Sequence, residues 1–146
     1  MGAGIVEVFA KGGHTVIGLA ESDAAVAAGQ RNLGSSLDRA TSRGKLTPEQ
    51  AQEIRTRVSW GTDFAMLRDC DVVVEAAPES VALKSEIFRE LDRHVGPEAI
   101  LATNTSSLSV TQIASVTRRP DHVVGMHFFN PAPVQRFVEV VRTVQA

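Results

Sequence analysis

One histidine of the sequence is placed where it could serve as a catalytic base. His127 ends the apolar segment His122–His127, and Glu139 follows it twelve residues later. Histidine exchanges protons near neutral pH, and a carboxylate beside it fixes its tautomer and stabilises the imidazolium. The pattern therefore indicates proton transfer, and a purely structural histidine is the alternative.

A polar run directly after another apolar segment gives a second candidate site. Asn104–Leu108 follows Ala99–Thr103, which is expected to be a buried strand. Polar residues at the carboxyl end of a parallel strand lie in the crevice where α/β sheets bind ligands. Ser106 or Ser107 would serve equally well as the cap of a following helix. Ligand binding and helix capping therefore both stay open for this run.

The chain starts with a short glycine-rich motif, Met1-Gly2-Ala3-Gly4-Ile5, and an amphipathic segment follows it. Dinucleotide-binding units need a strand and then G-x-G-x-x-G, so that backbone amides and a helix N-terminus meet the pyrophosphate. If Gly2 is the third of these glycines, the strand and the first two glycines precede residue 1. We therefore expect the chain to start inside such a unit.

The elements that must position these residues alternate between helix and strand. Helices are expected over Met1–Lys11, from Ser22 or Asp23 to near Gly44, from a capping box at Thr47–Gln50, over Ser80–Arg93 and over Val110–Val116. Strands are expected over Thr15–Leu19, Arg57–Trp60, Asp71–Glu75, Ala99–Thr103, His122–His127 and, at an edge, Phe137–Val141. This order predicts an α/β fold, a Rossmann-like doubly wound and mostly parallel sheet that lacks its first strand.

The absent strand would normally be central in such a sheet. Without it we expect two strands with unpaired edges and a slot in the core. We therefore predict weak cofactor affinity, marginal stability and a tendency to aggregate for these 146 residues.

Composition excludes several other classes of protein. A net charge of −2 gives no indication of a nucleic-acid partner, and no apolar run approaches the length of a membrane span. Met1–Phe9 has no basic region, so it does not resemble a signal peptide, and a cytoplasmic location is expected. Cys70 is interpreted as a buried structural thiol, and no histidine has the spacing of a zinc ligand. The histidines interpreted as structural are His14, His94 and His122.

Taken together, the motifs and their spacing closely resemble the 3-hydroxyacyl-CoA dehydrogenase family. The segments that carry the resemblance are Gly2–Ile5 with Glu7-Val8, Val73–Ala76 with Pro78-Glu79 and Lys84, Ala102–Leu108, His127–Pro131 and Val138–Val140. It covers essentially all 146 residues, and Asn104–Leu108 resembles the stand-alone enzymes more than the large multifunctional ones.

The resemblance implies a role for each matching residue. His127 would take the proton of the substrate's 3-hydroxyl group while a hydride passes to NAD, with Glu139 as its carboxylate partner. Ser106 would hydrogen-bond the reacting oxygen and so also bind substrate. The positions that match cofactor contacts are Gly2, Gly4, Glu21, Glu79, Lys84 and Asn130, and those that match coenzyme A contacts are Ser36 and Arg43. No metal is implied.

The sequence departs from the family's pattern at the second strand. Ala20 stands where the family has an acid that holds the adenosine ribose, and Glu21 beside it could substitute. No cluster of arginines follows that would favour NADP, so NAD is the expected cofactor.

The resemblance also implies a second, helical domain that completes the substrate site and forms a homodimer. We expect residues 1–146 to be an NAD-binding domain that is inactive alone, from an enzyme of fatty-acid or butanoate metabolism such as β-oxidation. Two alternatives stay open, a dehydrogenase of a hydroxy acid without coenzyme A and a catalytically silent binding module.

Overall fold

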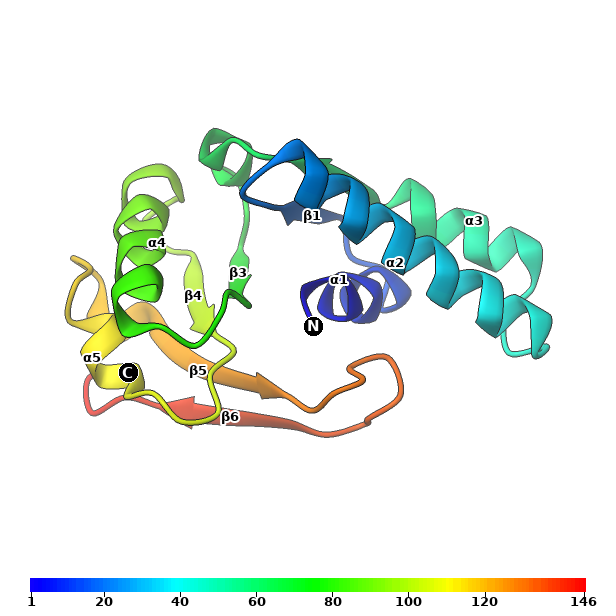
Figure 1. The fold of residues 1–146 in the computed structure, drawn as a ribbon. Coiled ribbons are helices and arrows are strands. Elements are labelled where there is room, and N and C mark those ends of the chain that lie inside the picture. Colours follow the sequence, from blue (N-terminus) through cyan, green and yellow to red (C-terminus); the bar gives the residue numbers. More distant parts are fainter. The chain divides into compact units, whose positions relative to one another are not determined.

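The computed structural model describes all residues from Met1 to Ala146, and the chain divides into two compact units (Figure 1). Unit 1 comprises Met1–Asp63 and Asn130–Val134, whereas unit 2 comprises Phe64–Phe129 and Gln135–Ala146. Each unit has its own sheet, with two strands in unit 1 and four strands in unit 2. The candidate catalytic residues Ser106, His127 and Glu139 all belong to unit 2.

Unit 1 is built from three helices and a parallel pair of strands. Its elements are α1 (Gly2–Lys11), β1 (Val16–Leu19), α2 (Asp23–Ser42), α3 (Pro48–Thr56) and β2 (Val58–Gly61). The hydroxyl of Ser22 caps α2, and Thr47 and Gln50 cap α3 as a reciprocal capping box. Strands β1 and β2 pair in parallel from Val16↔Val58 to Leu19↔Gly61.

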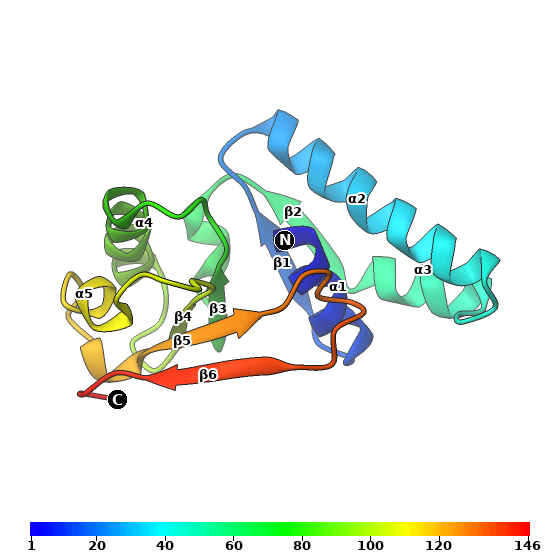
Figure 2. The same ribbon diagram turned by 60° about the horizontal axis from the view of Figure 1, so that its bottom comes forward.

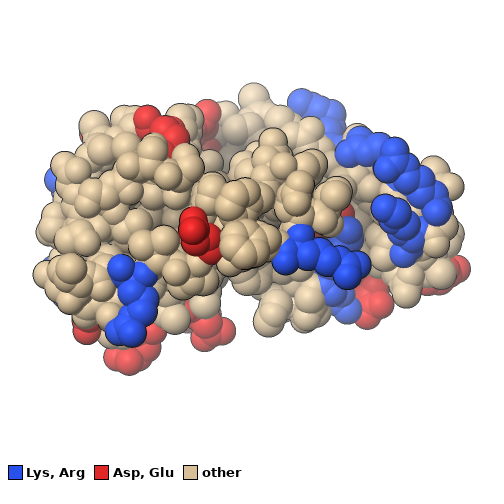
Figure 3. Space-filling model, turned by 90° about the horizontal axis from the view of Figure 1, so that it is seen from below, with Lys and Arg blue, Asp and Glu red and all other residues tan.

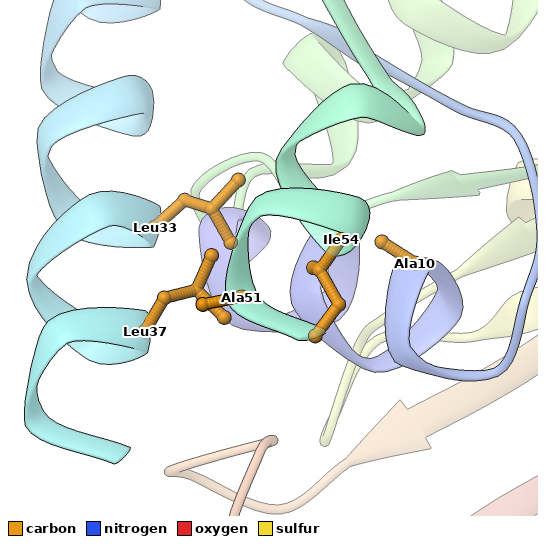
Figure 4. Packing of buried hydrophobic residues seen from close by; sticks show 5 residues of the cluster. All are labelled: Ala10, Leu33, Leu37, Ala51 and Ile54. Atoms are coloured by element: carbon orange, nitrogen blue, oxygen red, sulfur yellow. The ribbon is translucent and has the colours of Figure 1, made fainter. Parts of the chain in front are cut away.

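The core of unit 1 lies where its three helices meet. Figure 4 shows Leu33 and Leu37 of α2 beside Ala51 of α3, with Ile54 of α3 and Ala10 of α1 completing the cluster. All five side chains are buried. Burial of apolar surface, at about 25 cal/mol per Å², is what holds α1, α2 and α3 together.

A close approach between Trp60 and two glycines joins β1, β2 and α2 of unit 1. A Cβ atom added at Gly18 would lie 2.4 Å from Cε3 of Trp60, and one added at Gly29 would lie 2.6 Å from Cζ3. Real Cβ atoms essentially never come this near another heavy atom. Both positions therefore require glycine as long as the indole occupies this place.

Replacing Gly18 by alanine is expected to lower the free energy of unfolding by about 1–3 kcal/mol, because the added methyl group overpacks the indole. Trp60 is the single tryptophan, so denaturant unfolding followed by its fluorescence measures the effect. Gly34→Ala is the control, since nothing lies within 4 Å of its added Cβ on α2. Alanine should stabilise that helix by about 1 kcal/mol, and an equal loss in both variants would contradict the steric explanation.

Unit 2 carries the larger sheet. Its elements are η1 (Phe64–Leu67), β3 (Val72–Glu75), α4 (Val81–His94), β4 (Ile100–Thr103), α5 (Val110–Ala114), η2 (Pro120–His122), β5 (Val123–Phe128) and β6 (Val138–Arg142). The strand order is β3-β4-β5-β6, with the first three strands parallel and β6 antiparallel to β5. Figure 2 shows β5 and β6 running side by side in opposite directions.

The predicted fold class is confirmed, and so are the unpaired edges. Strand β1 pairs only with β2, and β3 pairs only with β4, so each stands at the edge of its sheet. The strand expected over Asp71–Glu75 is present as β3, although Val72 at its start is 40% exposed. Cys70 was expected to be buried but is only half-buried. Burial still raises the pKa of its thiol, with help from Asp71 and Asp69.

Two arginines close the C-terminal end of α4 in unit 2. The carboxylate of Asp92, on α4, accepts hydrogen bonds from Nε of Arg118 at 3.0 Å and from Nε of Arg119 at 2.9 Å. Arg119 also donates to the backbone oxygens of Asp92, Val95 and Gly96, at and just beyond the end of the helix. Burial works to raise the pKa of Asp92, but the bonds from Arg118 and Arg119 outweigh it and hold that pKa below its usual value.

This depressed pKa predicts a loss of stability in acid. A carboxylate with a lower pKa in the folded state stabilises fully above its unfolded pKa of about 3.9, and the stabilisation disappears as pH falls through the folded pKa. Asp92→Asn should therefore cost roughly 1.5–3 kcal/mol at pH 7 and flatten the decline below about pH 4. Thermal unfolding between about pH 2 and 7 checks this. The control is Asp38→Asn, because the exposed ion pair of Asp38 with Arg55 should contribute little to stability. If stability fell with decreasing pH as steeply in Asp92→Asn as in the unsubstituted chain, Asp92 would not be the source of the acid sensitivity.

Candidate active site

Five hydroxyl side chains follow one another from Thr103 to Ser109 at the end of β4, and four of them have partners within the protein. Thr103 donates to Glu75, Thr105 and Ser107 donate to Glu79, and Ser109 accepts from the Gln112 amide. The side chain of Ser106 is exposed and has no partner. Its hydroxyl is therefore available to a ligand. The cap of α5 is Ser109, so the alternative that Ser106 or Ser107 caps this helix was wrong.

His127 and Glu139 face each other across the antiparallel pair β5–β6. They are directly opposite in the register, which places both side chains on the same face of the sheet. Nδ1 of His127 lies 3.7 Å from Oε2 of Glu139, which is longer than a hydrogen bond. In this structure the pair is therefore within contact distance of an ion pair but is not hydrogen-bonded. Phe129 packs against the imidazole with ring centroids 4.6 Å apart.

Ser106 and His127 lie at the same edge of the unit 2 sheet. Strands β4 and β5 are parallel neighbours, and their register pairs Thr103 with Gly125. Ser106 follows the carboxyl end of β4, and His127 is the next to last residue of β5. Unit 2 thus brings together all three residues that the sequence predicts to be catalytic, Ser106, His127 and Glu139.

A buried ion pair lies beneath this edge. Lys84 of α4 is completely buried, and its Nζ lies 2.7 Å from Oε2 of Glu75, 3.0 Å from the backbone oxygen of Ala77 and 3.3 Å from Oε1 of Glu79. Three acceptors account for the three protons of the ammonium group. A direct contact between Lys84 and the cofactor stays a prediction. Glu75, which sequence reasoning missed as a site residue, is marked only by being an acid at the end of an apolar strand.

Glu79 connects the buried pair with the serine turn. Its side chain is 41% exposed, and its Oε2 accepts from Thr105 at 2.7 Å and from Ser107 at 3.2 Å. Burial works to raise the pKa of Glu79, but the Thr105 bond, the charge of Lys84 and the Ser107 bond outweigh it and lower that pKa. Glu79 therefore stays ionised and accepts both bonds at neutral pH.

Unit 1 carries four of the residues predicted to contact the cofactor, Gly2, Gly4, Glu21 and Asn130, and this role stays a prediction. Helix α1 has no side-chain cap and no acidic residue in its first turn, and the space around Gly2 is open to 4 Å. Free amides at a helix start suit a pyrophosphate. Glu21 lies two residues after the end of β1, is exposed and has no ion-pair partner, so its carboxylate can accept a hydrogen bond. A Cβ atom added at Gly4 would lie 3.1 Å from Cδ of Pro133. Glycine at this position therefore lets α1 pack closely against the segment that begins at Asn130.

Ser36 and Arg43, the predicted coenzyme A contacts, belong to α2 and its C-cap. Figure 3 shows several Lys and Arg side chains on the surface of the unit that carries α2 and α3. The exposed cations of α2 and the following turn that have no acidic partner are Arg31, Arg39, Arg43 and Lys45. Cations of this kind bind phosphate groups, so the surface suits a phosphorylated ligand.

No group of three or more His, Cys, Asp or Glu side chains is arranged to hold a metal ion. None of the helices combines the length and the apolar character needed to cross a membrane.

A parallel α/β fold with polar side chains at the carboxyl ends of its strands defines the class of α/β nucleotide-binding domains. The comparison with protein families agrees, since residues 1–146 match the family described as "3-hydroxyacyl-CoA dehydrogenase, NAD binding domain". The chain belongs to the 3-hydroxyacyl-CoA dehydrogenase family, and NAD is the cofactor of this domain.

Curated relatives and solved structures give the same result. The 3-hydroxybutyryl-CoA dehydrogenase of Mycobacterium tuberculosis is 44% identical over 145 residues, which are 99% of this chain and 51% of that protein. The 3-hydroxyadipyl-CoA dehydrogenase of Escherichia coli is 42% identical over 97% of this chain and 30% of its own length. The crystal structure of (S)-3-hydroxybutyryl-CoA dehydrogenase from Ralstonia eutropha superposes with a TM-score of 0.97 at 43% identity, over 99% of this chain and 51% of that one. The chain spans about half the length of the curated 3-hydroxybutyryl-CoA dehydrogenases that it matches.

Proposed function

We propose that this chain is the part of an enzyme that oxidises (S)-3-hydroxyacyl-CoA to 3-ketoacyl-CoA with NAD. One observation carries the proposal. Ser106 has the one unpartnered hydroxyl of its turn, and it lies at the same sheet edge as the His127–Glu139 pair. A hydroxyl donor and a base at one edge can both reach one substrate oxygen, which is what oxidation of an alcohol to a ketone needs.

The residues divide the work of removing one proton and one hydride from the substrate. His127 faces Glu139 with Nδ1, which leaves Nε2 to accept the proton of the 3-hydroxyl group. Glu139 stabilises the imidazolium that results, and Ser106 donates a hydrogen bond to the oxygen as its negative charge grows. NAD, when bound, accepts the hydride from C3. Glu79 and its bonds to Thr105 and Ser107 hold the serine turn in place.

A coenzyme A thioester is the substrate that unit 1 supports. Arg43 and its neighbouring cations on α2 offer positive charge without internal partners, and the phosphates of coenzyme A require such charge. The relatives from Mycobacterium tuberculosis and Escherichia coli are named for 3-hydroxybutyryl-CoA and 3-hydroxyadipyl-CoA. We place the reaction in fatty-acid or butanoate metabolism, including β-oxidation.

We also propose that turnover uses a further helical domain and a homodimer formed through it. The support is the exposed apolar surface of β6 and the residue before it, where Phe137 and Val140 are each 60% exposed. An apolar patch of this kind marks an interaction site. A cytoplasmic location is part of the same proposal, because the single unpaired Cys70 is typical of a reducing compartment.

A hybrid enzyme tests the substrate class. Residues 1–146 replace the aligned segment of the Mycobacterium tuberculosis 3-hydroxybutyryl-CoA dehydrogenase, so that every residue discussed above comes from this chain. The hybrid is expected to reduce NAD with (S)-3-hydroxybutyryl-CoA and not with free 3-hydroxybutyrate. Equal rates with both compounds would favour a dehydrogenase of free hydroxy acids. No NAD reduction with either would favour the silent binding module and contradict the proposal.

A further inference from the structure

We propose that Asn104 is a positioning residue, which holds the Ser106 turn and the His127-bearing end of β5 in one fixed arrangement. The inference rests on the proposed function, in which Ser106 and His127 act on the same oxygen. It adds a residue that touches neither substrate nor cofactor in that mechanism.

The reason lies in where the strand pairing stops. Pairing between β4 and β5 ends at Thr103↔Gly125, whereas β5 continues to Phe128 and pairs with β6 throughout. On the β4 side, the last residues of β5 extend beyond their neighbouring strand. The amide of Phe128, directly after His127, donates a hydrogen bond of 2.8 Å to Oδ1 of Asn104. The asparagine side chain thus continues the connection between the strands where the backbone ladder has ended.

Asn104 is itself held by a third strand. Its backbone amide donates to the oxygen of Glu75, the last residue of β3, at 2.8 Å. Asn104 therefore links the carboxyl ends of three strands. Its backbone amide bonds to β3, it directly follows β4 in the chain, and its side chain bonds to β5. Rigid placement of this kind is what a site for two reacting groups needs.

The other side of the serine turn is held by Glu79, through Thr105 and Ser107. Ser106 lies between these two anchored residues and keeps a free hydroxyl. Glu79 connects the turn to Lys84 of α4, whereas Asn104 connects it to Phe128 of β5. The two residues therefore fix the turn to different elements. Loss of the Asn104 bond would leave the turn intact but release the strand end that carries His127. A misplacement of about 1 Å is enough to slow a reaction on the order of 10²-fold.

Three variants test the proposal. Asn104→Ala removes the acceptor, Asn104→Asp keeps an acceptor oxygen, and Asn32→Ala is the control on the exposed surface of α2. The first readout is NMR on this chain alone, by hydrogen exchange of the Phe128 amide and the imidazole ¹⁵N signals of His127. The second is kinetics in the hybrid enzyme.

We expect Asn104→Ala to speed exchange at Phe128 at least about tenfold, as loss of a net hydrogen bond does, and to shift the His127 signals. In the hybrid it should lower kcat roughly 10–10²-fold with KM for NAD nearly unchanged. Asn104→Asp should restore both readouts, and Asn32→Ala should change neither.

Unchanged Phe128 exchange and His127 signals in Asn104→Ala would overturn the positioning role, whatever the hybrid does. If the alanine variant does not fold, Asn104→Asp serves as the test. Rapid exchange of the Phe128 amide in a folded aspartate variant would equally overturn the positioning role of Asn104. An inactive unsubstituted hybrid would overturn the proposed function instead, while the NMR result would still decide the role of Asn104.

Discussion

Replacing His127 by alanine in the hybrid enzyme is expected to lower kcat for 3-hydroxybutyryl-CoA oxidation by about 10²–10⁴-fold, the usual contribution of a general base. The physical reason is that hydride leaves C3 readily only as the hydroxyl loses its proton, and His127 is the base that Glu139 supports across the strand pair. Stopped-flow measurement of NAD reduction gives kcat, and calorimetry gives the affinity for NAD, which should change little.

His14→Ala is the matched control, because His14 is an exposed histidine in a turn of unit 1. It should leave kcat within about twofold of the unsubstituted hybrid, as surface substitutions usually do. A His127→Ala variant that retained kcat while losing affinity for NAD would assign the histidine to binding and contradict its role as base.

Replacing Lys84 by alanine is expected to lower the free energy of unfolding of this chain by roughly 3–5 kcal/mol. The substitution leaves the carboxylate of Glu75 buried without its cation, while Glu75 still accepts from Thr103 and from the Ala77 amide. Burial of an unpaired charge is among the costliest changes a folded protein can undergo. Urea unfolding followed by circular dichroism measures the loss.

A double variant separates the buried charge from lost packing. Glu75→Gln with Lys84→Met removes both charges and keeps two side chains of similar size, so it should recover much of the stability. Lys45→Ala, at an exposed position without a partner, should stay within about 0.5 kcal/mol of the unsubstituted chain. A double variant as unstable as Lys84→Ala alone would show that packing, and not the ion pair, explains the loss.

Local chemistry made much of the fold predictable from the sequence. Thr47 and Gln50 specify a helix start by themselves, because the side chain of each residue accepts a hydrogen bond from the backbone amide of the other. The apolar run before Asn104 predicts β4, because a short run of apolar residues is a local signal that can be read without knowing which strands pair with it. Ser106 lies just after β4 and His127 lies near the end of β5. Because these two strands are parallel neighbours, their carboxyl ends lie on the same side of the sheet.

What the sequence did not predict depends on residues that meet only in the folded chain. Lys84 was predicted as a cofactor contact, and its burial against Glu75 of β3 is seen only in the folded chain. Gly18 and Gly29 look unremarkable until Trp60 from β2 occupies the space of their missing side chains. Asn104 resembles an ordinary turn residue until the register of β5 brings the Phe128 amide to its side chain. In each case the partner lies on another element of the fold, so tertiary packing decides the role.

A double-mutant cycle on kcat in the hybrid, with Ser106→Ala, His127→Ala and the variant that carries both, shows whether the two side chains act together. If the Ser106 hydroxyl and the His127 imidazole converge on one substrate oxygen, their effects are strongly non-additive, as for groups that act as a unit. We expect each single variant to be slow and the double variant to be at most about tenfold slower than the slower single one. Rate losses that multiply in the double variant would contradict this convergence, because they would show that the two side chains act independently.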